Sequence, residues 1–319
     1  MKVRVVGAGI VGLACALRLR EAGHEVSLVA ADRPENTTSA VAAALWYPYR
    51  ALPEQAVTRW AARTYDVLTG MVDRPGTGVK LRTGRELFRL PTGDPWWAGA
   101  VPALKRVPPA GLPPGHADGL EFPAPVVDMR VHLAWLFDRV HALGVDITWG
   151  RVQHLADAAA DVDAVVNCTG LGARELVHDL TLTPVRGQVV IVEQTGLDGW
   201  TLDQSDPRQL TYVVPRTDTI VLGGTAEESD EDRAVRPATA SAILRRCSAL
   251  VPQVAGARIL GHRVGLRPAR PTVRLEAEEH AGRGVVVHCY GHGGAGVTLS
   301  YGCADDVVRL VSERASSGR

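Results

Sequence analysis

The first thirty residues contain two apolar runs separated by an apolar stripe at helical spacing. Residues 3–6 form a short run typical of a buried strand, and residues 25–30 form a second one. Between them, residues 10–22 place apolar side chains three or four positions apart and end at Gly23, a residue type that commonly follows a helix. A strand, a helix and a strand in this order predict a βαβ unit at the N-terminus.

Helical spacing recurs in four further segments. The expected helices span residues 53–72, 128–143, 238–250 and 301–314. Asp128 stands at the start of the second one, where a carboxylate accepts hydrogen bonds from the free amides of the first turn. Asp128 is therefore the expected N-cap of that helix.

Strand patterns fill much of the remaining chain. Residues 162–168 and 285–289 are mostly apolar without strict alternation, as in strands that are buried on both faces of a parallel sheet. Residues 185–193, 210–214 and 219–223 follow one another closely, which predicts an antiparallel sheet.

Two more strands are expected, at residues 79–90 and 262–270. Residues 91–127 contain many Pro and Gly and are expected to form ordered loop with little strand.

Together these elements predict an α/β fold made of two interleaved domains. Residues 1–50, 128–184 and 258–319 are assigned to a Rossmann-type dinucleotide-binding domain. Residues 51–127 and 185–257 are assigned to a second, sheet-rich domain, inserted discontinuously, that would bind the substrate.

A glycine cluster follows the first strand and opens the first helix. Gly7, Gly9 and Gly12 have the spacing of a dinucleotide fingerprint, in which the glycines permit a tight turn, close approach to a pyrophosphate, and helix–strand packing. Asp32 ends the second strand, where an acidic side chain binds a ribose hydroxyl. This motif alone does not separate NAD from FAD.

A second glycine-rich loop lies near the C-terminus. Residues 290–298 read YGHGGAGVT and separate an apolar run from the last expected helix. Such a loop lets backbone approach a flat ligand, and the helix after it directs its N-terminal amides at an anion. Two glycine-lined sites at opposite ends of the chain predict one elongated cofactor held from both sides, which favours FAD.

The charge balance, the hydropathy and the cysteine content limit the kinds of partner, metal site and cellular location that are expected. The 35 Lys and Arg residues balance the 35 Asp and Glu residues, so no nucleic-acid partner is expected. No apolar run approaches the ~20 residues that span a bilayer, so no membrane association is expected. The five cysteines are odd in number, far apart in the sequence and without a CxxC pair, which argues against a disulfide framework or a metal site and favours a cytoplasmic location.

Seven collinear segments resemble the D-amino-acid oxidase family over nearly the whole chain. They are VVGAGIVGL at 5–13, TTSAVAAALW at 37–46, VNCTG at 166–170, GQ at 187–188, YVVP at 212–215, VGLRP at 264–268 and YGHGG at 290–294. The resemblance implies non-covalently bound FAD and oxidative deamination of D-amino acids by oxygen to 2-oxo acids, ammonia and hydrogen peroxide. A homodimer is compatible with it.

Three substrate contacts follow from the resemblance. Arg267 and Tyr212 match the residues that bind the substrate carboxylate, and the carbonyl of Gly294 matches the acceptor for the substrate amine. With both groups fixed, one enantiomer presents its Cα–H to flavin N5. Hydride transfer then needs no side-chain acid or base, so no catalytic residue is expected.

The resemblance also places the cofactor, with Asp32 and Arg33 at the adenosine end, Val152 in the adenine pocket and Thr298 at the pyrimidine edge of the flavin. The full set of expected cofactor contacts is Gly7, Gly9, Ile10, Val11, Gly12, Asp32, Arg33, Thr37, Thr38, Ser39, Ala44, Leu45, Val152, Thr169, Gly170, Gly291, Gly293, Gly294, Gly296, Val297 and Thr298.

The chain departs from the family pattern around the substrate. The usual second tyrosine is missing at its two expected places, near Arg208 and at Ala226, and Ala295 stands where some relatives have an aromatic residue. The loop between Trp200 and Tyr212 is short for a lid. A more open site is therefore expected.

Other activities stay open at this point. Arg208 or Arg216 near the pocket would favour an acidic substrate, as in D-aspartate oxidases, and glycine or sarcosine oxidases share the architecture. The fingerprint also fits a nicotinamide-dependent dehydrogenase. A non-catalytic flavin-binding relative is disfavoured because both Tyr212 and Arg267 are present. The acidic run at residues 227–232 is expected to be a solvated loop.

Overall fold

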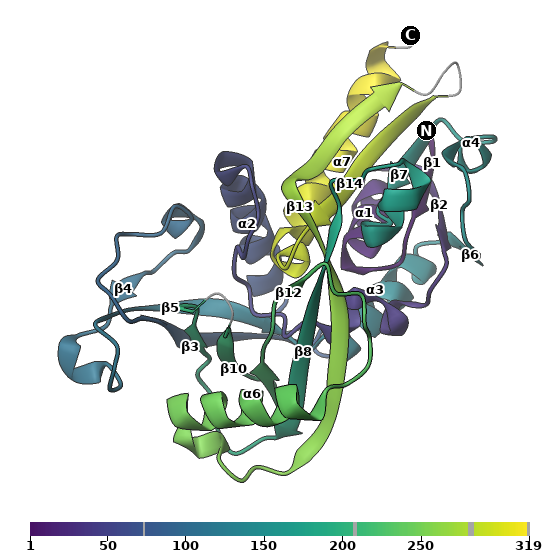
Figure 1. Cartoon of the computed structure of the whole chain (residues 1–319). Helices are drawn as coiled ribbons and strands as arrows, with labels where there is room; N and C mark the ends of the chain where they lie inside the picture. Colours follow the sequence, from purple (N-terminus) through teal and green to yellow (C-terminus); the bar gives the residue numbers. More distant parts are fainter. Residues whose placement is uncertain (73, 207–208, 280–283, 318–319) are drawn as a thin grey trace.

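The computed structural model describes residues 1–72, 74–206, 209–279 and 284–317. Their strands form one continuous mixed sheet (Figure 1). In spatial order the strands are β4 (Lys105–Arg106), β5 (Asp118–Val127), β3 (Val79–Phe88), β9 (Thr201–Asp203), β10 (Thr211–Pro215), β11 (Thr219–Gly223), β8 (Thr183–Glu193), β13 (Ile259–Glu279), β14 (Val285–His292), β7 (Ala164–Asn167), β1 (Lys2–Val6), β2 (Glu25–Ala30) and β6 (Asp146–Trp149), while β12 (Glu227–Glu228) pairs with β8 outside this path.

One end of the sheet is parallel. β1 lies between β2 and β7, and β14 and β6 extend the parallel set on its two sides. β7 and β14 are buried along their whole length, as the uninterrupted apolar runs predicted. The carboxyl ends of β1, β7 and β14 therefore meet at one edge of the sheet.

The other end of the sheet is mainly antiparallel. β8, β11 and β10 pair in the antiparallel order expected from the sequence, and β9 joins β10 to β3. The α/β fold class is confirmed, whereas the proposed domain boundaries stay a prediction.

Residues 91–127 contain more strand than expected. β5 pairs with β3 along its whole length, although it contains Pro123 and Pro125. These prolines face away from β3: the carbonyl of Pro125 accepts from Trp46 N at 2.8 Å on the opposite side of the strand. Because the missing proline amides point to that side, no hydrogen bond to β3 is lost.

Strand β13 belongs to both halves of the sheet. Its first part, up to Ala269, pairs with β8, and its second part, from Arg274, pairs with β14. In Figure 1 this long strand runs from the region of helix α6 (Pro237–Leu250) to the end of the molecule where the C-terminus lies. A single strand thus fixes the two halves of the sheet relative to each other.

Helices cover both ends of the sheet. The remaining helices are α1 (Ile10–Glu21), α2 (Glu54–Thr69), α3 (Met129–Ala142), α4 (Leu155–Ala158), α5 (Ala173–Leu176) and α7 (Gly296–Ser317), with short 3-10 helices at Pro34–Asn36, Thr38–Val41, Ala98–Ala100, Pro109–Gly111, Gly170–Gly172 and Pro252–Val254. α1, α2, α3 and α7 share the main apolar core, whereas α6 covers β8, β10 and β11 through Ile243 and Cys247. Asp128 caps α3 as expected, since its side chain accepts from Arg130 N.

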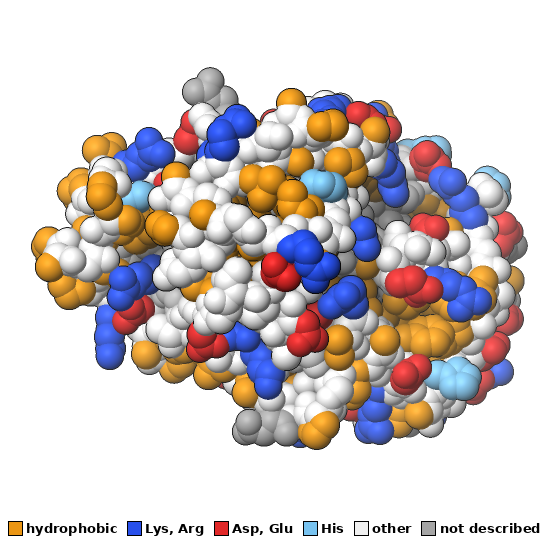
Figure 2. All heavy atoms as spheres, turned by 90° about the horizontal axis from the view of Figure 1, so that it is seen from below, with side chains coloured by type: hydrophobic (Ala, Val, Ile, Leu, Met, Phe, Trp, Pro, Cys, Tyr) orange, Lys and Arg blue, Asp and Glu red, His pale blue; other side chains and the backbone are white. Residues whose placement is uncertain are grey.

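The described surface carries mixed charge. Figure 2 shows Lys and Arg side chains interspersed with Asp and Glu side chains on the face seen from below, in agreement with the zero formal net charge. In the described part of the chain, the helices are too short or too polar to span a membrane.

Gly302 permits the contact between α7 and α2. A Cβ at this position would collide with the backbone of Trp60, and the Gly302 amide donates to Thr64 Oγ1 at 3.0 Å. We expect Gly302→Ala to lower the free energy of unfolding by roughly 1–3 kcal/mol, because the clash with rigid backbone outweighs the gain in helix propensity. Thermal unfolding of the purified protein measures this.

The matched control for Gly302→Ala is Gly99→Ala, because an added Cβ at exposed Gly99 meets no atom within 4 Å. Equal unfolding temperatures for the two variants would contradict the proposed packing.

Candidate functional site

A large pocket lies where the parallel and antiparallel halves of the sheet meet. Its volume is about 710 Å³, within the range of small-molecule sites. The turns after β1, β7 and β14 line it, together with residues of β8, β10 and β13. Parallel sheets bind ligands at this edge of their strands, so the strand order itself positions the site.

The β1–α1 turn brings bare backbone to this pocket. Gly7 has φ 116°, and a Cβ on it would lie 2.5 Å from the carbonyl oxygen of Cys168 on the neighbouring turn. A Cβ on Gly9 would lie 3.2 Å from Ser39 Oγ, which accepts from Ile10 N at 3.0 Å. Because α1 also begins at Ile10, its N-terminal amides lie at this turn, as a pyrophosphate site requires.

Most of the expected cofactor contacts line the pocket. Asp32, Val152, Thr169 and Gly170 do so, as do Thr37, Thr38 and the residues of the fingerprint turn. The hydroxyl of Thr37 donates to Pro34 O at 2.7 Å and that of Thr38 to Leu266 O at 3.1 Å. These two hydroxyl protons are thus already engaged with backbone.

Two expected contacts lie outside the pocket lining. Arg33 stacks over the ring of Trp149, with 5.0 Å between its guanidinium carbon and the ring centroid. Gly291 faces Arg270, whose Cβ would lie 2.9 Å from a Cβ added to the glycine. The role of Gly291 is therefore to leave room for an arginine side chain.

The second glycine loop connects β14 to α7. Gly293, Gly294, Gly296 and Val297 line the pocket, and α7 begins at Gly296. The first amides of a 22-residue helix therefore lie at this wall of the pocket. Thr298 also lines the pocket, and its hydroxyl accepts from Tyr47 N at 3.0 Å and donates to Tyr47 O at 2.9 Å.

Arg267 and Tyr212 come together at the substrate end of the pocket. Arg267 donates from Nη1 to Thr225 O at 2.8 Å, and no carboxylate of the described residues forms an ion pair with it. A Cβ on Gly187 would lie 2.5 Å from that nitrogen, and a Cβ on Gly223 would overlap the Tyr212 ring. The two side chains thus lie directly against bare backbone of β8 and β11. The guanidinium group is left with donors for a carboxylate ligand.

Tyr49 is a third member of this group that sequence reasoning missed. It lines the pocket, its ring lies against the Cα of Gly294, and its buried hydroxyl has no hydrogen-bond partner among the described residues. Burial raises the pKa of both Tyr49 and Tyr212, so both hydroxyls stay protonated donors at neutral pH. Tyr49 therefore supplies a second tyrosine from a different segment than the two places where one was expected.

Further pocket residues beside Tyr212 were also missed. They are Tyr47, Leu202, Gln204, Leu210 and Val214. Tyr47 and Tyr49 belong to the stretch WYPY at residues 46–49, which directly follows the expected contacts Ala44 and Leu45. Their position next to this motif was the available signal. The others lie on β9, β10 and the loop between them, and nothing in their spacing marks them.

The arginines considered for an acidic substrate do not both fall in the described region. Arg216 is buried outside the pocket, where Nη2 donates to Ala42 O at 2.7 Å and Nη1 lies 3.7 Å from Asp128 Oδ1. It therefore cannot bind a substrate carboxylate in this arrangement, which corrects that expectation. Arg208 lies outside the described residues.

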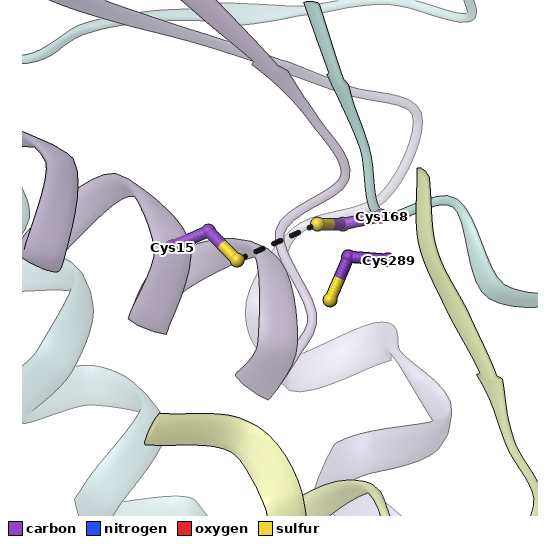
Figure 3. Close-up of side chains that lie close together, drawn as sticks. All are labelled: Cys15, Cys168 and Cys289. Carbon is purple, nitrogen blue, oxygen red and sulfur yellow. Dashed lines mark hydrogen bonds between the residues drawn. The ribbon is translucent and has the colours of Figure 1, made fainter. Parts of the chain in front are cut away.

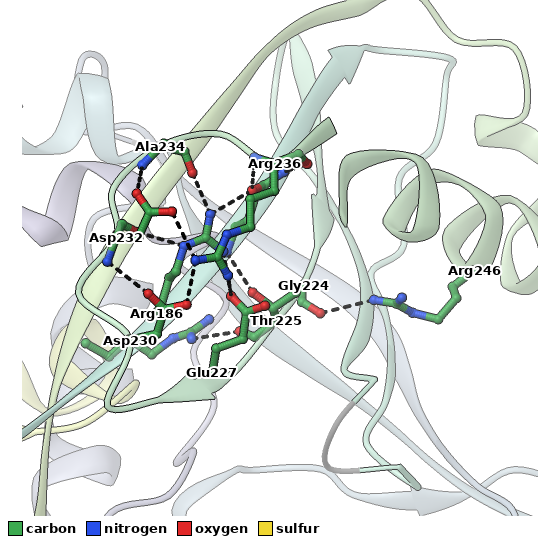
Figure 4. Close-up of polar contacts among 11 residues, drawn as sticks. Arg186, Gly224, Thr225, Glu227, Asp230, Asp232, Ala234, Arg236 and Arg246 are labelled. Carbon is green, nitrogen blue, oxygen red and sulfur yellow. Dashed lines mark hydrogen bonds and ion pairs between the residues drawn. The ribbon is translucent and has the colours of Figure 1, made fainter. Parts of the chain in front are cut away.

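The acidic run at residues 227–232 is largely exposed, as expected, and three of its carboxylates also belong to an ion-pair network (Figure 4). Arg186 of β8 is fully buried, and its Nη1 lies 2.5 Å from Glu227 Oε2. Asp230 and Asp232 pair with Arg236 at 2.8 and 3.0 Å. Because Arg186 precedes Gly187 on the same strand, this network anchors the strand beside Arg267.

Three cysteines that are distant in sequence come together in space (Figure 3). The sulfur atoms of Cys15, Cys168 and Cys289 lie within 4.8 Å of one another, and Cys289 forms a similar group with His292 and Cys303. All are free thiols, and burial raises the pKa of Cys303 well above its usual range. Cysteines that are far apart in the sequence thus meet in space, because α1, β14, α7 and the end of β7 converge here.

The pocket therefore combines a dinucleotide cradle with a carboxylate site. The close approaches at Gly7 and Gly9 and the two helix N-termini fit the phosphates and flavin of FAD, and Arg267 with Tyr212 and Tyr49 forms a site for a carboxylate. These features define a flavin-dependent oxidoreductase.

The chain belongs to the family described as DAO, FAD-dependent oxidoreductase, whose model matches residues 2–310. It is 52% identical to a D-amino-acid oxidase of Rubrobacter xylanophilus, over 96% of this chain and 94% of that protein. It is 45% identical to a D-amino-acid oxidase of Streptomyces coelicolor over 98% and 97%, and 34% identical to the human D-aspartate oxidase over 98% and 95%.

The fold is also that of solved oxidases. The glycine oxidase from Geobacillus kaustophilus superposes with a TM-score of 0.82 at 20% identity, covering 98% of this chain and 94% of that one. Because the family is described as FAD-dependent, FAD is the cofactor of the family to which this chain belongs.

Gly7 tests the cofactor cradle. We expect Gly7→Ala to weaken FAD binding at least about tenfold, because the new Cβ meets the Cys168 carbonyl and φ is positive. Titration of the apoprotein with FAD, followed by flavin fluorescence, gives the dissociation constant. Gly23→Ala is the control: φ is +85° there, but no atom lies within 4 Å of the added Cβ. Equal losses in both variants would contradict a specific role for Gly7.

Proposed function

We propose that this chain catalyses the FAD-dependent oxidative deamination of D-amino acids, using oxygen and water and yielding 2-oxo acids, ammonia and hydrogen peroxide. The observation that carries the proposal is the position of Arg267 beside Tyr212 and Tyr49, opposite the glycine loop of Gly294. The nearly full-length similarity to two D-amino-acid oxidases supports the same conclusion.

The residues of the pocket bind and orient the substrate. Arg267 holds the carboxylate through two parallel hydrogen bonds, and Tyr212 donates a further one. The carbonyl of Gly294 accepts from the amine. When bound, FAD supplies the acceptor for the hydride. With carboxylate and amine both fixed, one enantiomer presents its Cα–H to the cofactor, so orientation carries the step without a side-chain acid or base.

Three alternatives receive less support. A D-aspartate oxidase needs a cation for the second carboxylate. Arg216 is engaged elsewhere, which leaves Arg233 of the pocket lining as the candidate for that role. A glycine or sarcosine oxidase does not need the apolar space beside Leu202, Leu210 and Val214. A nicotinamide-dependent dehydrogenase does not account for the second glycine loop.

We also propose a cytoplasmic location and the absence of a structural metal. Five free cysteines suit a reducing compartment, and the sequence has no CxxC pair of the kind that commonly holds a structural metal. The resemblance is compatible with a homodimer, which stays a prediction. Light scattering of the holoprotein measures the oligomeric state.

Anaerobic mixing of the holoprotein with D-alanine tests the proposed reaction. We expect D-alanine to bleach the visible flavin band and L-alanine to leave it unchanged, because only one enantiomer satisfies Arg267 and Gly294 together. A yellow protein that neither enantiomer bleaches would contradict this substrate, and glycine and D-aspartate would be tried next. A colourless protein that binds no added FAD would overturn the flavin assignment itself.

Arg267 tests the substrate orientation. We expect Arg267→Leu to raise KM for D-alanine by about 10- to 100-fold, since hydrogen bonds to charged groups contribute about 1.5–3 kcal/mol. Tyr212→Phe is expected to have a smaller effect because the guanidinium still binds the carboxylate. The control is Arg263→Leu on the same strand, whose exposed side chain bonds only the carbonyl of His262 in the described residues. An unchanged KM in Arg267→Leu would remove this residue from the site.

A further inference from the structure

A buried carboxylate lies directly behind the substrate end of the pocket. Glu86 on β3 is 3% exposed. Its Oε1 accepts from Tyr47 Oη at 2.6 Å and from Gln204 Nε2 at 3.3 Å, whereas Oε2 has no hydrogen-bond partner in the described part of the chain. Among the described residues no cation pairs with it. Buried carboxylates are normally paired, so Glu86 is an exception that needs an explanation.

Both partners of Glu86 line the pocket. Tyr47 and Gln204 do so together with Leu202, which pairs with Glu86 across β3 and β9. The backbone of Tyr47 forms two hydrogen bonds with the Thr298 hydroxyl. Its ring packs against Trp97, with 5.4 Å between the ring centroids. The carboxylate is thus separated from the pocket by two oriented polar side chains.

The hydrogen bonds to Glu86 determine which polar atoms of Tyr47 and Gln204 remain available to a ligand. The Tyr47 hydroxyl gives its proton to Glu86, and its oxygen lies next to the side-chain donors of Gln204 and Trp97. The amide group of Gln204 directs its NH₂ to Glu86, so its oxygen is the group left for a ligand. Gln204 therefore retains an acceptor for a substrate, backed by the buried carboxylate of Glu86.

Other charged groups near Glu86 are engaged elsewhere. Its neighbour Arg85 pairs with Glu121 of β5 at 2.8 Å, and Asp203, beside Gln204, contacts His116 at 3.1 Å. The residue opposite Glu86 on β5 is the apolar Leu120. Tyr47 is the one titratable group that the described residues bring into hydrogen-bond contact with Glu86.

We propose that Glu86 determines the charge preference of the enzyme for the substrate side chain: acting through Tyr47 and Gln204, it favours D-amino acids with neutral hydrogen-bond donors or cations and rejects those with a second carboxylate. The inference rests on the proposed function and deepens it. Rejection arises because an anionic side chain that approaches Gln204 meets an acceptor oxygen backed by a like charge. Glu86 is thus a specificity-determining residue that need not touch the substrate.

The charge state of Glu86 gives this preference a pH dependence. Burial raises its pKa to about 7, and the hydrogen bonds from Tyr47 and Gln204 oppose that rise. Glu86 is therefore largely neutral below pH 6 and ionised above pH 8. Discrimination against an anionic side chain should accordingly increase as pH rises through about 7.

The test compares D-asparagine with D-aspartate, which are similar in size and differ in side-chain charge. We expect the ratio of kcat/KM for the two substrates at pH 8 to fall about tenfold in Glu86→Gln, which keeps the shape and removes the charge. In the unmodified enzyme this ratio should rise with pH through about 7, and in Glu86→Gln it should be flat. Glu121→Gln is the control: it removes the same charge from the neighbouring strand, where Glu121 pairs with Arg85.

A second variant keeps the test decisive if Glu86→Gln fails to fold or to retain flavin. Tyr47→Phe removes a donor from Glu86, which raises its pKa further and moves the inflection of the ratio to higher pH. An unchanged ratio and profile in these variants, in an enzyme that oxidises D-alanine, would overturn the inference alone. An enzyme that oxidises no D-amino acid would instead overturn the proposed function.

Discussion

The active-site geometry depends on the continuity of β13 between the two halves of the sheet. Arg267 lies in the part of this strand that pairs with β8, and two residues later Ala269 pairs with His292 at the end of β14. The carbonyl of Pro268 then accepts from Gly293 N at 2.9 Å. Arg267, which we propose binds the carboxylate, and the glycine loop expected at the cofactor are therefore joined through adjacent backbone hydrogen bonds, which fix their relative position.

Close packing then leaves room for the functional side chains only where a neighbour has none. Arg267 lies against Gly187, Tyr212 against Gly223, and Tyr49 against Gly294. Each glycine belongs to a different strand or loop, so the site is assembled from several segments that the sheet brings together. A methyl group at any of these positions would move a side chain that orients the substrate, and small displacements of this kind reduce rates strongly.

Local patterns in the sequence predicted much of this architecture. The βαβ opening, the buried strands β7 and β14, and the fingerprint turn each follow from spacing within a few neighbouring residues, so they could be recognised from the chain alone. Strand β5 was missed because its prolines suggested loop, although their orientation spares the pairing with β3. Tyr49, Glu86 and the cysteine group could not be predicted, since each depends on contacts between segments that are distant in the chain.

The contrast between two of the buried charged side chains in the sheet shows where this protein tolerates an unpaired ion. Arg186 is fully buried but surrounded by Glu227, Gln188 and two backbone carbonyls, so its charge is compensated in place. Glu86 is almost as deeply buried, and the described residues give it two neutral donors, no cation and no partner for one of its oxygens. A buried group of this kind costs free energy, and evolution removes such a cost easily by exchange for an amide or an apolar side chain. Its place beside the substrate end of the pocket supplies a reason for keeping it, because the same uncompensated field that destabilises the fold acts on the ligand.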